Sequence, residues 1–118
     1  MHQHFWMNSD PPRLLIRDLN VRILNTTFTC ISCDQVKRDW TLKHRGMDLM
    51  DCASVFVGLH QTREDLRRDY KERRYITVGF LSQALCVVVW TDRAPALHFI
   101  SVRKANHRER RAFEVVYH

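Results

Sequence analysis

The spacing of apolar residues changes along the chain and divides it into extended and helical segments. Residues 28–33 are short, β-branched and aromatic, which predicts a first strand. Apolar residues then recur three or four positions apart, which predicts a helix over 35–45 and a shorter one over 47–56. Asp34 is the candidate N-cap of the first helix, and Gly46 is its stop signal.

The period falls to two between residues 59 and 103, as it does in strands with one buried face. Four segments alternate in this way, the first weakly and the others strongly: 59–66, 73–81, 84–90 and 96–103. Helical spacing returns after Arg103. The pattern predicts an α+β fold, in which two short N-terminal helices and a C-terminal helix pack on an antiparallel sheet of about four strands.

Residues 1–27 have no sustained period. Charged residues interrupt the apolar positions, and the prolines at 11 and 12 disfavour helix entry from Asp10. We expect residues 1–27 to be an N-terminal extension, either poorly ordered or a loosely packed helix or strand. A start codon placed too far upstream would give the same pattern. Residues 28–118 are expected to form the folded domain.

Composition narrows the class of partner. The chain has 118 residues, enough for one domain with a core, and its formal net charge of +6 favours a polyanion such as nucleic acid, an anionic membrane or an acidic protein. No apolar run approaches the length of a membrane span, and the first residues lack the pattern of a secretory signal. We therefore expect a cytoplasmic protein without a membrane partner and with reduced cysteines.

The cysteines do not predict a metal site. Cys30 and Cys33 are an odd number of positions apart on a predicted strand, so their side chains point to opposite faces and cannot bind one ion together. No second ligand pair with the spacing of a zinc site follows them. We expect neither a metal nor a cofactor.

Two basic clusters are the candidate functional features. In residues 63–75 arginines alternate with acidic residues, so a self-neutralising surface of ion pairs is the simpler interpretation. The second cluster, Arg93 with residues 103–111, contains few acids. Convergent arginines suit a phosphodiester, because one guanidinium group binds two phosphate oxygens at once.

Metal-free RNA cleavage requires a group that takes the 2′-OH proton, cations on the phosphate and an acid for the leaving oxygen. His44 and His98 are candidates for base or acid, because histidine changes charge near neutral pH. Glu72 and Tyr75 are lesser candidates for proton transfer. Most histidines in proteins are structural or lie on the surface, so chemistry alone leaves these roles open.

Three blocks of the sequence resemble the BrnT family, the ribonuclease toxins of bacterial type II toxin–antitoxin systems. Residues 34–56 are similar to the two opening helices of the family, and residues 63–81 to its acidic and arginine-rich loop with the strand that follows. Residues 87–113 are similar to its last two strands and closing helix, and this block is the most specific. The resemblance implies that residues 28–118 are a BrnT-like domain with a RelE-like fold.

The chemistry and the resemblance together define a candidate site. We expect five catalytic residues: His44, Glu72, Arg74, His98 and Arg103. Five further residues are expected to bind RNA or phosphate: Lys43, Arg73, Arg93, Lys104 and Arg108. Three residues are expected to face an antitoxin: Arg103, Arg108 and Arg111. The chain departs from the family pattern at His98, where the family usually has arginine, and at Lys71, which replaces a usual glycine.

The resemblance implies a ribonuclease toxin that cleaves RNA without a metal and thereby inhibits translation and growth. A BrnA-like ribbon-helix-helix antitoxin would neutralise it, and operator DNA would be bound only by the complex of the two. The alternative is a catalytically degenerate family member that binds antitoxin or nucleic acid without cleaving. A third hypothesis is a basic interaction domain with no nuclease ancestry, which predicts no ribbon-helix-helix gene directly downstream.

Overall fold

The described part of the chain folds into one sheet and three helices. A computed structural model describes residues 5–7 and 14–117, with side chains from residue 17 onward. The strands are β1 (Phe5–Met7), β2 (Leu14–Ile23), β3 (Thr26–Asp34), β4 (His60–Glu64), β5 (Arg74–Leu81), β6 (Ala84–Arg93) and β7 (Ala96–Lys104). The helices are α1 (Gln35–Arg45), the 3₁₀-helix η1 (Leu49–Phe56) and α2 (His107–Val116). None of these three helices is long and apolar enough to cross a membrane.

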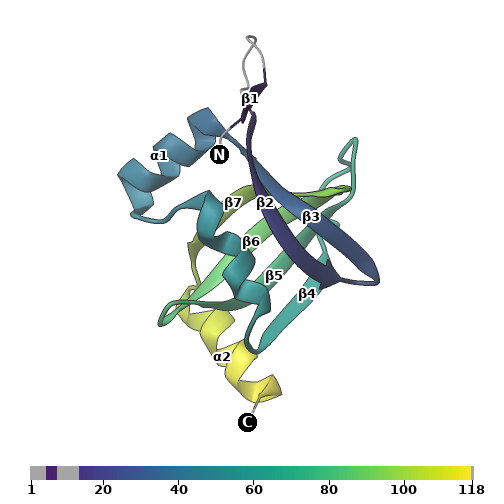
Figure 1. The fold of residues 1–118 in the computed structure, drawn as a ribbon. Coiled ribbons are helices and arrows are strands. Elements are labelled where there is room, and N and C mark those ends of the chain that lie inside the picture. The colour runs from purple at the N-terminus through teal and green to yellow at the C-terminus, as the bar shows by residue number, and fades with distance from the viewer. Residues whose placement is uncertain (1–4, 8–13, 118) are drawn as a thin grey trace.

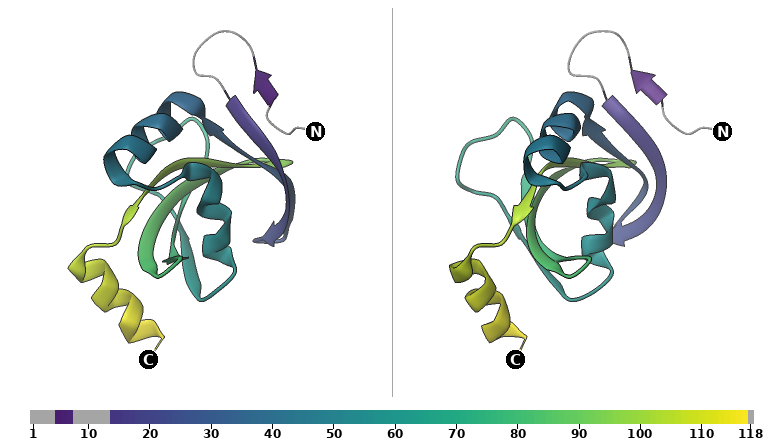
Figure 2. Two further views of the ribbon diagram at one scale, coloured as in Figure 1. Left: turned by 60° about the vertical axis from the view of Figure 1, so that its left-hand side comes forward. Right: turned by 90° about the vertical axis from the view of Figure 1, so that its left-hand side faces the viewer.

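The strands form a single curled sheet in the order β1-β2-β3-β7-β6-β5-β4 (Figure 1). β3 and β7 run parallel, whereas the other neighbouring pairs are antiparallel. The sheet curls around η1, which lies on its inner side, and α2 lies on its outer side (Figure 2). The molecule therefore has a covered inner face and an outer face that α2 covers only in part.

The main core lies on the inner face and is centred on Trp90. The rings of Phe28 and Phe56 meet this indole edge-on at centroid distances of 6.2 and 5.8 Å, and Tyr75 stacks on it at 4.7 Å. The indole N–H donates to the hydroxyl of Thr77 at 2.8 Å, so the polar end of the buried ring is satisfied. η1 closes this core with four buried side chains: Leu49, Met50, Cys52 and Val55.

α1 begins and ends where the sequence predicts. The carboxylate of Asp34 accepts a hydrogen bond from a backbone N–H of the first turn, and Gly46 takes the left-handed conformation that ends the helix. Pairing between β3 and β7 stops before the second half of β7, and α1 packs beside that edge instead. There Thr41 is buried, and the guanidinium of Arg45 donates to the carbonyl of Val102 at 2.8 Å.

A bulge in β7 sets which of its side chains face inward. Ile100 has no partner on β6, because the register shifts by one residue at this point. Phe99 and Val102 therefore both join the inner core although they are an odd number of positions apart. The same shift places Arg103 on the outer face together with His98.

The predicted α+β class is confirmed, but the predicted strand count, sheet type and helix order are wrong. The described sheet has seven strands rather than about four, because residues 14–23 pair with β3 and residues 5–7 pair with β2. The sheet is mixed, since β3 and β7 are parallel. The two expected helices exist as α1 and η1, but strands precede them, so they are not N-terminal. The RelE-like arrangement in its predicted form is not matched.

The expected boundary at residue 28 falls inside β3. β2, which belongs to the expected extension, is hydrogen-bonded to β3 over most of its length. Residues 1–4 and 8–13 of the expected extension lie outside the described residues.

The closest approach between η1 and the sheet provides a test of this packing. A Cβ added at Gly79 would lie 2.7 Å from a methyl carbon of Val55 and 3.0 Å from its carbonyl oxygen. Gly79→Ala should therefore lower the free energy of unfolding by about 1–3 kcal/mol, because η1 must shift away from β5. Gly58→Ala is the control, since a Cβ there meets nothing within 4 Å. Urea unfolding followed by circular dichroism measures both, and equal stabilities for the two variants would contradict this packing.

Candidate active site on the outer face of the sheet

A row of polar residues crosses four neighbouring strands on the outer face. Ser32 of β3 lies opposite His98 of β7, which lies opposite Thr91 of β6, which in turn lies opposite Arg74 of β5. Residues that are register partners project from the same face of a sheet, about 5 Å apart from strand to strand. Four polar side chains that are distant in the sequence are therefore neighbours.

His98 is the buried member of this row. Its side chain is 5% exposed, and its Nδ1 lies 2.7 Å from the hydroxyl oxygen of Ser32. Burial lowers the pKa of His98 to about 4, the charges of Arg93 and Arg74 act in the same direction, and that of Glu72 opposes them. The imidazole is therefore neutral at pH 7, and Nε2 is the ring nitrogen that Ser32 does not contact.

The loop between β4 and β5 brings the carboxylate of Glu72 to this row, where it meets Arg93 of β6. The buried carboxylate of Asp65 organises the loop by accepting hydrogen bonds from the guanidinium of Arg67, at 2.7 Å, and from the hydroxyl of Tyr70, at 3.1 Å. Farther along the loop lies Glu72, whose two carboxylate oxygens accept hydrogen bonds from Arg93 at the end of β6, at 2.8 and 3.2 Å. This hydrogen bonding lowers the pKa of Glu72, so its carboxylate stays ionised and fixes Arg93.

Arg74 is held by an aromatic ring. Its guanidinium carbon lies 4.2 Å from the centroid of the Tyr70 ring, a cation–π contact. Its Nε is buried and has no hydrogen-bond partner among the described residues. A buried N–H without an acceptor costs free energy, which the contact with the Tyr70 ring offsets in part.

These side chains surround a recess of about 200 Å³, which we call the His98 recess. It is lined by Asp34, Lys37, Arg74, Arg93, His98, Phe99 and Ile100. The lining carries three cations and one carboxylate, and that carboxylate already caps α1. A recess of this size with convergent cations and a neutral imidazole suits a phosphate group.

Four of the predicted residues meet at this recess or beside it: Glu72, Arg74, Arg93 and His98. His44 is not among those that line the recess. It is exposed on α1, where its ring stacks on Trp40 at 4.5 Å and its Nδ1 lies 2.9 Å from the Trp40 carbonyl oxygen.

Arg103 belongs to a second recess, about 320 Å³ in volume, between α2 and the sheet. Both of its terminal nitrogens donate to the carboxylate of Glu109 at 2.8 Å, and this pairing lowers the pKa of Glu109 to about 2. Arg103 lies five positions after His98 along β7, roughly 15 Å for an extended strand. The charge of Arg103 is therefore neutralised within the protein and lies away from the imidazole.

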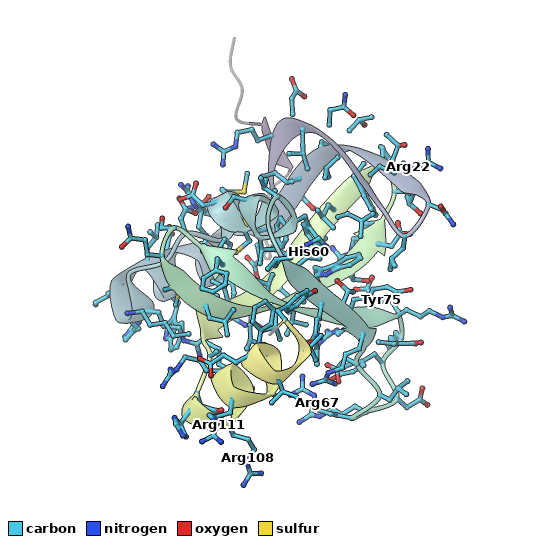
Figure 3. The ribbon with its side chains drawn as sticks, turned by 90° about the horizontal axis from the view of Figure 1, so that it is seen from below. Arg22, His60, Arg67, Tyr75, Arg108 and Arg111 are labelled. Carbon is cyan, nitrogen blue, oxygen red and sulfur yellow. The ribbon has the colours of Figure 1, made fainter. Side chains whose placement is uncertain are left out.

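The remaining predicted residues are exposed at several places on the surface: Lys43, Arg73, Lys104, Arg108 and Arg111. Arg108 and Arg111 project from α2 away from the body of the protein (Figure 3). Lys104 borders a different hollow, with Met47 and Cys86. None of these five lines the His98 recess.

Sequence reasoning missed Ser32, Lys37 and Tyr70. Ser32 contacts His98 because β3 pairs in parallel with β7, and Lys37 lines the recess because α1 begins directly after β3. No local motif carries that information. The interleaved charges around Tyr70 predict solvated ion pairs, which holds for Arg73 with Glu64. This interpretation does not hold for Asp65, whose carboxylate is buried against Arg67, and it overlooks the cation–π contact between Tyr70 and Arg74.

No group of three or more His, Cys, Asp or Glu side chains that could hold a metal ion occurs among the described residues. All four cysteines are free thiols.

The charges at the recess predict how His98 titrates. Its imidazole should gain a proton only near pH 4, and Arg93→Ala should raise that pKa, because it removes a nearby positive charge and leaves Glu72 unpaired. Nuclear magnetic resonance of the ring nitrogens between pH 3 and 8 measures both values. Arg22→Ala, which removes an exposed arginine on β2, is the control (Figure 3). A pKa that is unchanged in Arg93→Ala would show that this charge does not act on His98.

Comparison with known proteins identifies the family of the chain. Residues 34–109, more than half of the chain, match the family model described as the ribonuclease toxin BrnT of type II toxin–antitoxin systems. No curated protein matches the chain. The matched residues include the recess side chains from Asp34 to Ile100 and stop within α2. The chain therefore belongs to the BrnT family of ribonuclease toxins.

Proposed function

We propose that this protein is a metal-independent endoribonuclease whose active site is the His98 recess. The observation that carries the proposal is the neutral, buried imidazole of His98 beside the guanidinium groups of Arg74 and Arg93. This arrangement combines a proton acceptor with cations for a phosphate, the two elements that attack by a 2′-hydroxyl requires. Such a toxin would act on cellular RNA in the cytoplasm and inhibit translation and growth.

The proposed reaction is an internal phosphoryl transfer. The 2′-oxygen of the substrate attacks the adjacent phosphorus while its proton passes to Nε2 of His98. The bond from phosphorus to the 5′-oxygen breaks, and that oxygen takes a proton from water. The hydroxide left behind takes the proton from Nε2 of His98, which returns the imidazole to its neutral form. The products are a 2′,3′-cyclic phosphate and a 5′-hydroxyl. Arg74, Arg93 and Lys37 contact the non-bridging oxygens and stabilise the charge that develops on them.

Glu72 has a positioning role in this proposal. Its carboxylate is engaged by two nitrogens of Arg93, which makes it a poor acceptor for the substrate proton. Its ionised carboxylate holds the Arg93 side chain in place at the His98 recess. We therefore assign proton transfer to His98 alone.

The other candidate residues receive roles outside the recess. Lys43, His44, Arg73 and Lys104 are candidates for contacts with RNA beyond the reacting phosphate. Arg103 is assigned to a structural pair with Glu109 rather than to catalysis. The toxin domain would comprise residues 28–118 together with β2 and the start of β3, because β2 pairs with β3 over most of its length.

A type II system includes an antitoxin, and we propose a BrnA-like protein with a ribbon-helix-helix DNA-binding part. The exposed arginines of α2, Arg108 and Arg111, offer positive charge to an acidic partner. In this proposal the complex, rather than the toxin, binds operator DNA.

One observation favours a second function. His98 is 95% buried and stands where the BrnT resemblance expects an arginine, so the recess has one fewer cation than that pattern implies. A member that had lost catalysis would still bind antitoxin or nucleic acid. The two functions differ in whether the purified protein cleaves RNA.

Cleavage of a short RNA by the purified protein tests the proposal. His98→Ala and Arg74→Ala should each slow cleavage at least about a hundredfold, because one removes the base and the other a phosphate contact. Arg22→Ala, an exposed arginine on β2, should retain the rate. Addition of a chelator should not change cleavage. If the folded wild-type protein leaves RNA intact, the proposed cleavage is contradicted and the protein is a catalytically degenerate binding module.

A further inference from the structure

Ser32 and His98 form a buried pair that joins two parallel strands. The two residues are register partners on β3 and β7, and their side chains meet at 2.7 Å. Ser32 is 2% exposed and His98 is 5% exposed. Ser32 precedes the segment that matches the family model, so the match does not cover this contact.

The hydrogen bond fixes the orientation of the imidazole. Nδ1 faces β3, because it bonds with the Ser32 hydroxyl, and the ring lines the His98 recess. The other ring nitrogen, Nε2, has no hydrogen-bond partner in the described part of the chain. It lies across the ring from Nδ1 and so is the nitrogen available to a ligand.

The charges of the recess and the Ser32 hydroxyl together set which nitrogen carries the proton. The cations around the ring are Lys37, Arg74 and Arg93. The carboxylates are those of Glu72, which is paired with Arg93, and of Asp34, which caps α1. A proton on Nε2 would point its positive end at these cations, whereas a lone pair on Nε2 is stabilised by them. These cations favour the proton on Nδ1, where the Ser32 hydroxyl oxygen, 2.7 Å away, is the acceptor available to it.

We propose that Ser32 is a positioning residue that holds His98 in the Nδ1–H tautomer and directs the Nε2 lone pair into the recess. The catalytic consequence rests on the proposed function, because that lone pair is the acceptor for the 2′-OH proton. The tautomer itself does not depend on whether RNA is cleaved. A serine hydroxyl that donated to Nδ1 would instead put the proton on Nε2 and leave the recess without a base.

Nuclear magnetic resonance of the ¹⁵N-labelled full-length protein at pH 7 tests the proposal directly. In wild type the chemical shifts should identify Nδ1 as the protonated nitrogen of His98. In Ser32→Ala the tautomer should change to Nε2–H, the form that imidazole favours in water, and Ser32→Thr should restore the wild-type pattern. Thr62→Ala is the control, since it removes a comparable hydroxyl pair, at 2.8 Å to Thr77, between other strands.

RNA cleavage by the same variants measures the consequence. Ser32→Ala should lower kcat about ten- to a hundredfold, as loss of an orienting hydrogen bond to a reactive histidine does, and should leave KM unchanged because the cations remain. Thermal unfolding confirms that each variant is folded.

The outcomes distinguish the role of Ser32 in the His98 tautomer from the proposed cleavage of RNA. An Nε2–H tautomer in wild type, or an unchanged Nδ1–H tautomer in folded Ser32→Ala, overturns the role of Ser32. If Ser32→Ala does not fold, wild type and Ser32→Thr decide the question. The Nδ1–H tautomer in both proteins supports the role of Ser32, and the Nε2–H tautomer in wild type or in Ser32→Thr overturns it. Absence of cleavage by wild type contradicts the proposed function and leaves the tautomer result to decide the inference.

Discussion

The parallel pairing of β3 with β7 is the constraint on which the candidate site depends. It places Ser32 opposite His98 and ends where α1 begins, so Asp34 and Lys37 arrive at the same recess. Parallel neighbours need a long connection, and here α1, η1 and three antiparallel strands form it. The connection also covers the inner face with η1, so the same chain path builds the core and leaves the outer face accessible.

The sheet and the loop before β5 together control charge at the recess. Burial keeps the His98 ring neutral, and the cations that would bind phosphate are those that disfavour its protonation. Those cations are themselves restrained: Arg93 by the carboxylate of Glu72 and Arg74 by the ring of Tyr70. Restraint of this kind lowers the entropy lost when a ligand binds, which is how preorganised sites gain affinity and rate.

Local signals in the sequence predict local structure well in this chain. The caps of α1, the second short helix and the strands β5 to β7 follow from capping residues and apolar period. β2 was not predicted, because its stability comes from pairing with β3 and its charged positions hide the alternation. The bulge at Ile100 and the parallel pairing of β3 with β7 are likewise non-local. Because of the bulge, strict alternation along β7 predicts the wrong face of the sheet for the Arg103 side chain.

Residue type and family resemblance predicted part of the site, and the rest depends on which strands pair. Glu72, Arg74, Arg93 and His98 were identified from residue type and family resemblance, and the fold brings them together. Arg103 was included because arginine suits phosphate, but Glu109 lies close enough to neutralise it. Ser32 has no motif, since its importance depends entirely on the strand that pairs with its own.

The most direct measurement is a titration of the labelled protein with a nucleoside 2′,3′-cyclic phosphate, followed by nuclear magnetic resonance of its histidine rings and arginine side chains. Saturable shifts at His98, Arg74 and Arg93, with a rise in the pKa of His98 as the phosphate binds, are the predicted result. Shifts at Arg103 and along α2, with His98 unchanged, would contradict the assignment of the His98 recess as the active site.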